Sequence, residues 1–128
     1  IKKIVHNPPP VLRSKRTTVS QHYERMQLYM QKEAPYKDVS FDREAMASKL
    51  GLSPSSITRI LKAEGQRNFN DYINRYRIKL ARQMLTDPRF DIFSLEAIGR
   101  EVGFKSRSSF YQSFKKEVGI APGKFKKK

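Results

Sequence analysis

Apolar residues recur along this chain at intervals of three and four positions, the spacing that places them on one face of a helix. The stretch 19–32 follows this pattern and ends before Pro35. A longer stripe runs over 69–85, and at about 1.5 Å per residue this helix would be roughly 25 Å long. No segment shows the alternation that marks a strand. The pattern therefore predicts an all-α fold. The longer stripe consists of Phe69, Tyr72, Ile73, Tyr76, Leu80, Met84 and Leu85.

One short helical unit occurs twice in the chain. The first copy, 44–65, has the sequence EAMASKLGLSPSSITRILKAEG, and the second copy begins with EAIGREVGFKSRSSFYQSFKKEVG at position 96. The front halves are offset by 52 positions, and one extra residue in the second turn makes the later offset 53. The matching pairs are Glu44 with Glu96, Ala45 with Ala97, Gly51 with Gly103, Ile57 with Phe110, and Leu61 with Phe114.

The spacing within each copy is that of two helices joined at a steep angle by a short turn. Ala47 lies four residues before Gly51, and Ile57 lies six residues after it. The small residue allows close approach, the glycine takes a positive φ, and the apolar residue fills the angle between the helices. The second copy has Gly99, Gly103 and Phe110 in these roles. The residues Asp42, Ser53, Ser94 and Ser106 are predicted helix N-caps.

A single such unit arises by chance in many helical bundles, but two copies with matching caps favour two helix-turn-helix lobes joined by the long helix, with about seven helices in all. We divide the chain into a basic, proline-containing linker or tail at 1–18, a first lobe with its connecting helix at 19–85, and a second lobe with a basic C-terminal tail at 86–128. The first segment is interpreted as a connector, with an arm lying along phosphates as the alternative. Because the chain begins with Ile1, we interpret it as a fragment of a longer protein.

The charge of the chain indicates an anionic partner. Lys and Arg number 27 against 12 Asp and Glu, which gives a net charge of +15 and a pI near 10.3. Nucleic acid, an anionic membrane and an acidic protein all fit such a charge, and a merely basic surface is the remaining alternative. No apolar run approaches the roughly 18 residues of a membrane span, so we expect no membrane contact by this segment.

Catalytic chemistry has few candidate residues here. The chain has no cysteine, and its two histidines, His6 and His22, lie outside the repeats. The serine-rich stretch 106–109 has no acid–base partner nearby in the sequence, and there is no glycine-rich phosphate loop or paired-carboxylate motif. We therefore expect no enzyme activity, no metal and no cofactor.

The second helix of each unit has a polar outer face without an acidic residue before Glu64 or Glu117 near its end. A helix inserted in a major groove needs short hydroxyl groups near phosphates and Arg or Gln long enough to reach base edges. Most aromatic residues lie instead on the predicted core stripes, which argues against an RNA-binding fold with exposed stacking rings. The outer faces consist of Ser55, Ser56, Thr58, Arg59 and Lys62 in the first unit, and Arg107, Ser108, Tyr111, Gln112 and Lys115 in the second.

On these residues the chain resembles the DNA-binding domain of AraC/XylS-type bacterial transcription regulators, over about 19–126. The motif positions are Ile98-Gly99, Val102-Gly103-Phe104, Ser106, Phe110, Phe114-Lys115-Lys116, Gly119, Pro122 and Phe125. The chain departs from the family at Gly99, where Ala is usual, at Ala121, where Thr or Ser is common, and at Phe125-Lys126, where Tyr-Arg is common.

The resemblance implies a cytoplasmic transcription regulator that binds double-stranded DNA with two recognition helices in successive major grooves, and that contacts RNA polymerase when it activates. The outer faces of the two units differ, so we expect an asymmetric two-box site. The expected base-contacting residues are Ser55, Thr58, Arg59, Arg107, Ser108, Tyr111 and Gln112. The expected backbone-contacting residues are Ser53, Ser56, Lys62, Ser106 and Lys115.

Overall fold

The computed structural model describes residues 18–127, and within that range the fold is all-α, as the sequence predicts. The seven α-helices are α3 (Thr18–Glu33), α4 (Arg43–Leu50), α5 (Pro54–Ala63), α6 (Phe69–Leu85), α7 (Leu95–Glu101), α8 (Arg107–Val118) and α9 (Pro122–Lys127). Two short 3-10 helices, η1 (Pro35–Lys37) and η2 (Pro88–Phe90), lie in the connecting loops. The predicted tail at 1–18 lies outside the described residues, apart from Thr18, which begins α3.

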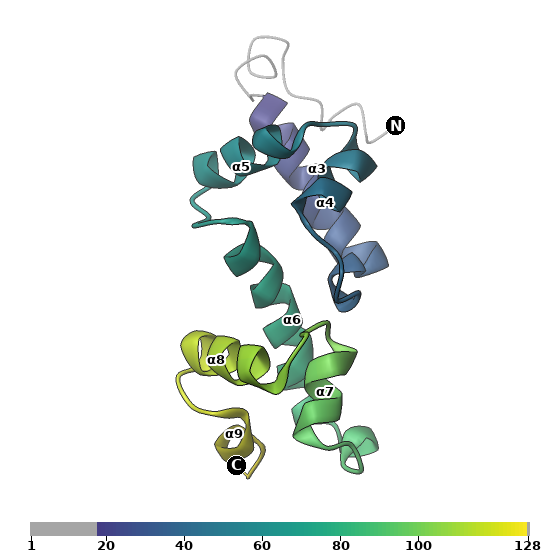
Figure 1. Cartoon of the computed structure of the whole chain (residues 1–128), viewed down its shortest axis with the longest axis vertical. Coiled ribbons are helices and arrows are strands. Elements are labelled where there is room, and N and C mark those ends of the chain that lie inside the picture. The colour runs from purple at the N-terminus through teal and green to yellow at the C-terminus, as the bar shows by residue number, and fades with distance from the viewer. Residues whose placement is uncertain (1–17, 128) are drawn as a thin grey trace, which may run out of the picture.

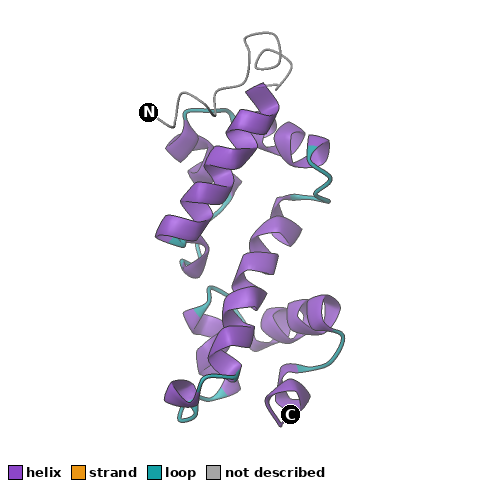
Figure 2. Cartoon of the chain, turned by 180° about the vertical axis from the view of Figure 1, so that it is seen from behind, coloured by secondary structure: helices purple, strands orange, loops and turns teal. Residues whose placement is uncertain are grey.

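The helices form two lobes at the two ends of α6 (Figure 1). Helices α3, α4 and α5 surround the first half of α6, and α7, α8 and α9 surround the second half. The view from behind shows only helices and loops, and in both views α5 and α8 extend to the same side of α6 (Figure 2). The second helices of the two repeated units are therefore presented on one side of the molecule.

Side-chain caps fix where the four helices of the repeated units begin. The carboxylate of Asp42 accepts a hydrogen bond from the backbone N–H of Ala45 at 2.8 Å. The hydroxyl oxygens of Ser53, Ser94 and Ser106 accept equivalent bonds at 3.0–3.1 Å. Each bond satisfies a helix N–H that has no partner within its own helix. All four predicted N-caps are confirmed.

Each lobe has its own hydrophobic core, and α6 contributes to both. Tyr72 and Ile73 of α6 pack into the first core, whereas four later residues pack into the second. Ile73 and Ile78 are separated by about 140° around a helix with 3.6 residues per turn. All seven residues of the predicted stripe pack against one of the two cores, but the stripe missed Ile78 and Ala81, because the second lobe covers another side of the helix. The α6 residues of the second core are Ile78, Ala81, Met84 and Leu85.

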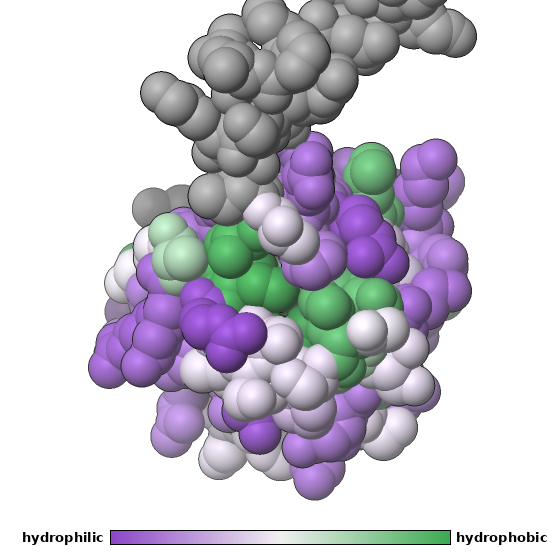
Figure 3. Space-filling view, turned by 90° about the horizontal axis from the view of Figure 1, so that it is seen from above, coloured by the Kyte–Doolittle hydropathy of each residue, from purple (hydrophilic) through white to green (hydrophobic). Residues whose placement is uncertain are grey.

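The end of the first lobe has apolar residues on its surface as well as in its core. Figure 3 looks onto that end and shows hydrophobic residues gathered in the centre of the face, with hydrophilic residues around them. Met26, Met30 and Met46 are completely buried in this core. Methionine side chains adapt to irregular gaps, which suits the junction of three short helices.

Close packing of α7 against α8 explains the small residue of the second unit. A Cβ atom built at Gly99 would lie 2.7 Å from Cδ2 of Phe110, which is completely buried. Phe110 also contacts Phe104 and Phe114, with ring centroids 5.5 and 5.9 Å apart. Phe125 packs edge-on against Phe114 at 5.4 Å and so anchors the C-terminal helix α9 to the second core.

We predict that Phe110→Ala lowers the free energy of unfolding by about 3–5 kcal/mol, because a large aromatic side chain is removed from a closed core. Urea unfolding followed by circular dichroism measures this loss. The control is Ser108→Ala, which removes an exposed hydroxyl from the same helix. A loss of less than about 1 kcal/mol for Phe110→Ala would contradict the packing described for the second lobe.

Candidate nucleic-acid interface

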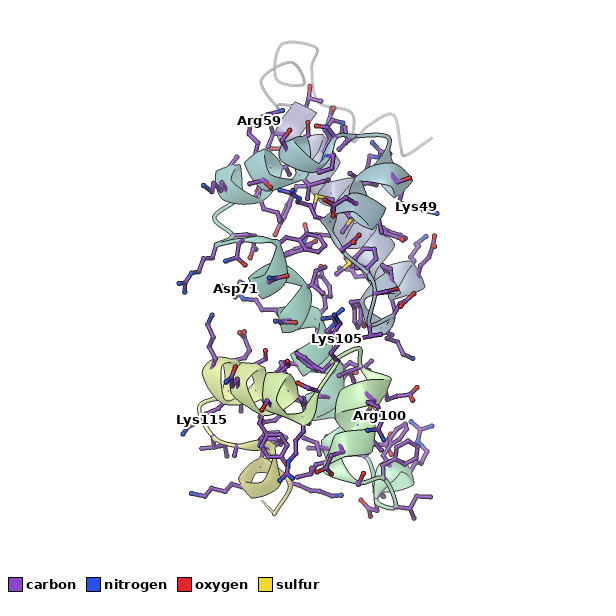
Figure 4. The ribbon with its side chains drawn as sticks, viewed as in Figure 1. Lys49, Arg59, Asp71, Arg100, Lys105 and Lys115 are labelled. Atoms are coloured by element: carbon purple, nitrogen blue, oxygen red, sulfur yellow. The ribbon has the colours of Figure 1, made fainter. Side chains whose placement is uncertain are left out.

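Helix α5 separates a buried apolar face from a polar outer face. Ile57, Ile60 and Leu61 are buried, as the spacing predicts. On the outer face Ser53, Ser55, Arg59 and Lys62 are exposed, and Ser56 and Thr58 are half-buried. Figure 4 shows Arg59 near the end of the first lobe. The structure thus brings all the predicted site residues of the first unit to one helix and the turn before it.

A hydrogen-bonded chain of polar groups orients Arg59. The hydroxyl of Ser53 donates to the hydroxyl oxygen of Ser56 at 2.9 Å, and Nη2 of Arg59 donates to the same oxygen at 3.2 Å. Ser53 also caps the helix through its hydroxyl oxygen. The guanidinium group is therefore held against the first turns of α5 while its side chain stays exposed.

Arg43, at the first position of α4, is a site residue that the sequence reasoning missed. Its Nη1 donates to the hydroxyl oxygen of Thr58 at 2.7 Å, so a second cation lies beside the outer face of α5. Arg43 also lies 3.8 Å from Glu44, measured from Nη2 to Oε2. The sequence carried one electrostatic indication of this contact. A cation at the N-terminus of a helix opposes the helix dipole, which suggests that it has a partner outside the helix.

Helix α8 presents the corresponding polar face in the second lobe. Arg107, Ser108, Gln112 and Lys115 are exposed, as is the capping residue Ser106. Tyr111 is half-buried, and its ring lies edge-on to Phe110 at 5.9 Å. The ring of Tyr111 therefore packs on the second core, and its polar edge is the part left for a ligand.

An acidic residue from another helix lies beside this face. Oε2 of Glu96 on α7 is 3.2 Å from Nη1 of Arg107, and the Arg107 guanidinium lies 4.9 Å from the centre of the Tyr111 ring. The prediction of an acid-free face holds for α8 itself, and Glu96 of α7 is an acidic neighbour that the prediction did not cover. Sequence position could not show this, because the contact depends on how α7 packs against α8.

Ion pairs join the C-terminal half of α8 to α6. Nζ of Lys116 is 3.2 Å from Oδ1 of Asp71, and Nε of Arg75 is 3.6 Å from Oε2 of Glu117. Figure 4 shows Lys115 and Asp71 on the side to which α8 extends, with Lys105 between the lobes. Asp71 and Glu117 are thus both paired with basic side chains.

In the range 18–127, no three His, Cys, Asp or Glu residues are grouped so that they could hold a metal ion. A cavity of about 480 Å³ between α3 and α6 is lined mainly by tyrosine and glutamine side chains, with Arg75 and Lys79. The Tyr72 hydroxyl is buried there without a hydrogen-bond partner, and burial raises the pKa of that phenol, so it stays neutral. None of the helices from α3 to α9 is long and apolar enough to cross a membrane.

The paired helix-turn-helix units and their cationic outer faces define the class: this is a helix-turn-helix DNA-binding domain of the kind carried by transcription regulators. A family model described as a helix-turn-helix domain matches residues 46–128. The chain belongs to the AraC-type family of helix-turn-helix regulators.

Known relatives and a solved structure agree with this placement. The Msm operon regulatory protein of Streptococcus mutans is 32% identical over 82 residues, which are 64% of this chain and 28% of that protein. The arabinose operon regulatory protein of Escherichia coli is 29% identical over 89 residues, or 70% of this chain and 30% of that protein. The C-terminal domain of AraT, a response regulator from Geobacillus stearothermophilus, shares the fold with a TM-score of 0.73 at 23% identity, covering 87% of this chain and 88% of that one.

We predict that Glu96→Gln raises affinity for DNA by up to about fivefold, because an exposed ion pair worth about 0–1 kcal/mol no longer holds Arg107 and one negative charge is removed. Fluorescence anisotropy with a labelled duplex at about 0.15 M salt measures the change. Glu101→Gln, at an exposed position of the same helix, is the matched control for the change in charge. An equal gain for both variants would show that Glu96 has no specific effect on Arg107.

Proposed function

We propose that this chain is the DNA-binding output domain of a bacterial transcription regulator and that it binds one asymmetric double-stranded site with α5 and α8 in successive major grooves. The observation that carries the proposal is the presentation of both helices, with their polar faces exposed, on the same side of α6. Successive major grooves are about 34 Å apart. A connecting helix of 17 residues, about 25 Å long, together with the width of the lobes can bridge that distance.

Base recognition is assigned to the exposed turns of the two helices. Arg59 is the strongest candidate, because a bidentate contact from arginine to guanine discriminates by about 1–3 kcal/mol. Arg107 or Gln112 takes the equivalent role in the second lobe. We assign Ser55, Thr58, Arg59, Arg107, Ser108, Tyr111 and Gln112 to bases, and Ser53, Ser56, Lys62, Ser106 and Lys115 to the backbone.

The asymmetry of the site follows from the different outer faces. The first unit offers hydroxyl groups and one arginine, whereas the second offers an arginine, a tyrosine edge and a glutamine. Different donors and acceptors recognise different base edges. One chain is therefore proposed to bind two unlike boxes.

In the proposed full-length regulator, a domain other than this one receives the signal. The chain spans about 30% of the length of the two curated relatives described above. We propose that an effector or sensor domain accompanies it in the full protein, that the regulator acts in the cytoplasm, and that it contacts RNA polymerase when it activates. AraT, whose C-terminal domain shares this fold, is a response regulator, which supports the presence of a second, signal-receiving domain in the full protein.

Selection of bound duplexes from random DNA by this 128-residue chain at about 0.15 M salt tests the proposal. The expected result is an enriched sequence with two different boxes one helical turn apart. Salt-sensitive binding without any enriched sequence would show instead that the chain is a non-specific polycation.

Two variants of α5 should separate base recognition from backbone contact. We predict that Arg59→Ala loses discrimination at one position of one box, by about 1–3 kcal/mol. Lys62→Ala should weaken binding to all DNA sequences equally. It should also lower the slope of log affinity against log salt concentration by about one. Titrations against the selected site and its single-base variants measure both effects. An unchanged preference and affinity for Arg59→Ala would contradict the assignment of α5 to a major groove.

A further inference from the structure

Arg77 lies where α6 passes from the first core to the second. It is half-buried and follows Tyr72 and Ile73 of the first core, and it directly precedes Ile78 of the second. Its guanidinium group donates from Nε to the carbonyl oxygen of Tyr36 at 2.8 Å and from Nη2 to the carbonyl oxygen of Asp38 at 3.4 Å. Both acceptors belong to the loop between α3 and α4, so Arg77 ties the first lobe to the middle of α6.

The same side chain contacts the turn of the second helix-turn-helix unit. The guanidinium carbon is 5.6 Å from the centre of the Phe104 ring. A Cβ atom built at Gly103 would clash with the carbonyl oxygen of Tyr36 and would lie 2.7 Å from Nε of Arg77. Arg77 therefore packs tightly between the turn of the second lobe and the loop of the first lobe. Gly103 also has a φ of 114°, which favours glycine on its own account.

Apart from α6 itself, ion pairs between α6 and α8 also connect the two lobes. Their side chains are 21–59% exposed, and such pairs contribute little to stability. Arg77 makes charge-assisted bonds from a partly desolvated site, and burial lowers the pKa of its guanidinium while the nearby Asp38 carboxylate opposes that shift. A planar guanidinium group can hold two carbonyls and cover a ring at once, which a lysine ammonium cannot do.

We infer that Arg77 is a positioning residue that sets the angle between α5 and α8, and through it the spacing between the two DNA boxes that one chain accepts. The inference rests on the proposed function, in which both helices bind one duplex together. A change of one base pair in the spacing rotates one box relative to the other by about 35° and moves it by about 3.4 Å. A rigid junction rejects that change, because simultaneous binding then requires distortion, whereas a loose junction accepts it.

The test compares the 128-residue wild-type chain with Arg77→Met on duplexes carrying the selected boxes at the native spacing, at one base pair more or less, and singly. Lys79→Met is the matched control, because it removes one positive charge from an exposed position of the same helix. We expect the wild type and Lys79→Met to lose about tenfold in affinity per added or removed base pair. Arg77→Met should lose less than about threefold in affinity per added or removed base pair. Its affinities for single boxes should stay within about twofold of those of the wild type.

Equal spacing penalties in the wild type and Arg77→Met would overturn the role of Arg77 and leave the two-groove proposal standing. A wild type that is indifferent to spacing would overturn both.

If Arg77→Met does not fold, Arg77→Lys replaces it, and a second measurement applies. The chain has no cysteine, so spin labels can be placed at Lys62→Cys and Lys115→Cys in the free protein. The distance distribution between the labels should broaden in Arg77→Lys, and an unchanged width would overturn the inference.

Discussion

The structure depends on one helix being shared by two cores. Tyr72 and Ile73 at the start of α6 are buried by the first lobe, and Ile78, Ala81, Met84 and Leu85 are buried by the second. Within residues 18–127 each lobe has three other α-helices, and each uses α6 to complete an apolar interior. Because the helix is stiff, burying both of its halves also sets how far apart the two lobes lie along it. Stability and the presentation of α5 and α8 therefore have the same origin.

The excess of basic residues determines which kind of partner this geometry suits. With 27 basic and 12 acidic residues, the chain has a surplus of cations, and acids such as Asp71 and Glu117 lie in ion pairs with basic neighbours. The hydroxyl groups of Ser53 and Ser106 perform a structural task as caps and also lie at the exposed ends of α5 and α8. In the proposed function, long-range attraction brings DNA to such a surface, and the differing side chains of α5 and α8 select the sequence.

Local features of the fold could be predicted from the sequence, and features that join distant segments could not. Helix bounds follow from local chemistry, so the caps at Asp42, Ser53, Ser94 and Ser106 were all identified. The change of buried side along α6 depends on where two separate lobes pack, and the single predicted stripe missed Ile78 and Ala81. The same reason applies to the candidate site. The polar faces of α5 and α8 could be identified from the sequence. The contacts of Arg43 with Thr58 and of Glu96 with Arg107 could not, because they form only when the helices pack together.

The central claim is that a single chain occupies two unlike boxes on one face of a duplex. A hydroxyl-radical footprint of the 128-residue chain on its selected duplex tests this most directly. The account predicts two protected patches about ten base pairs apart on the same face, unequal in extent, and saturated at one chain per duplex. A single protected patch, or a two-fold symmetric pattern that saturates at two chains per duplex, would contradict it.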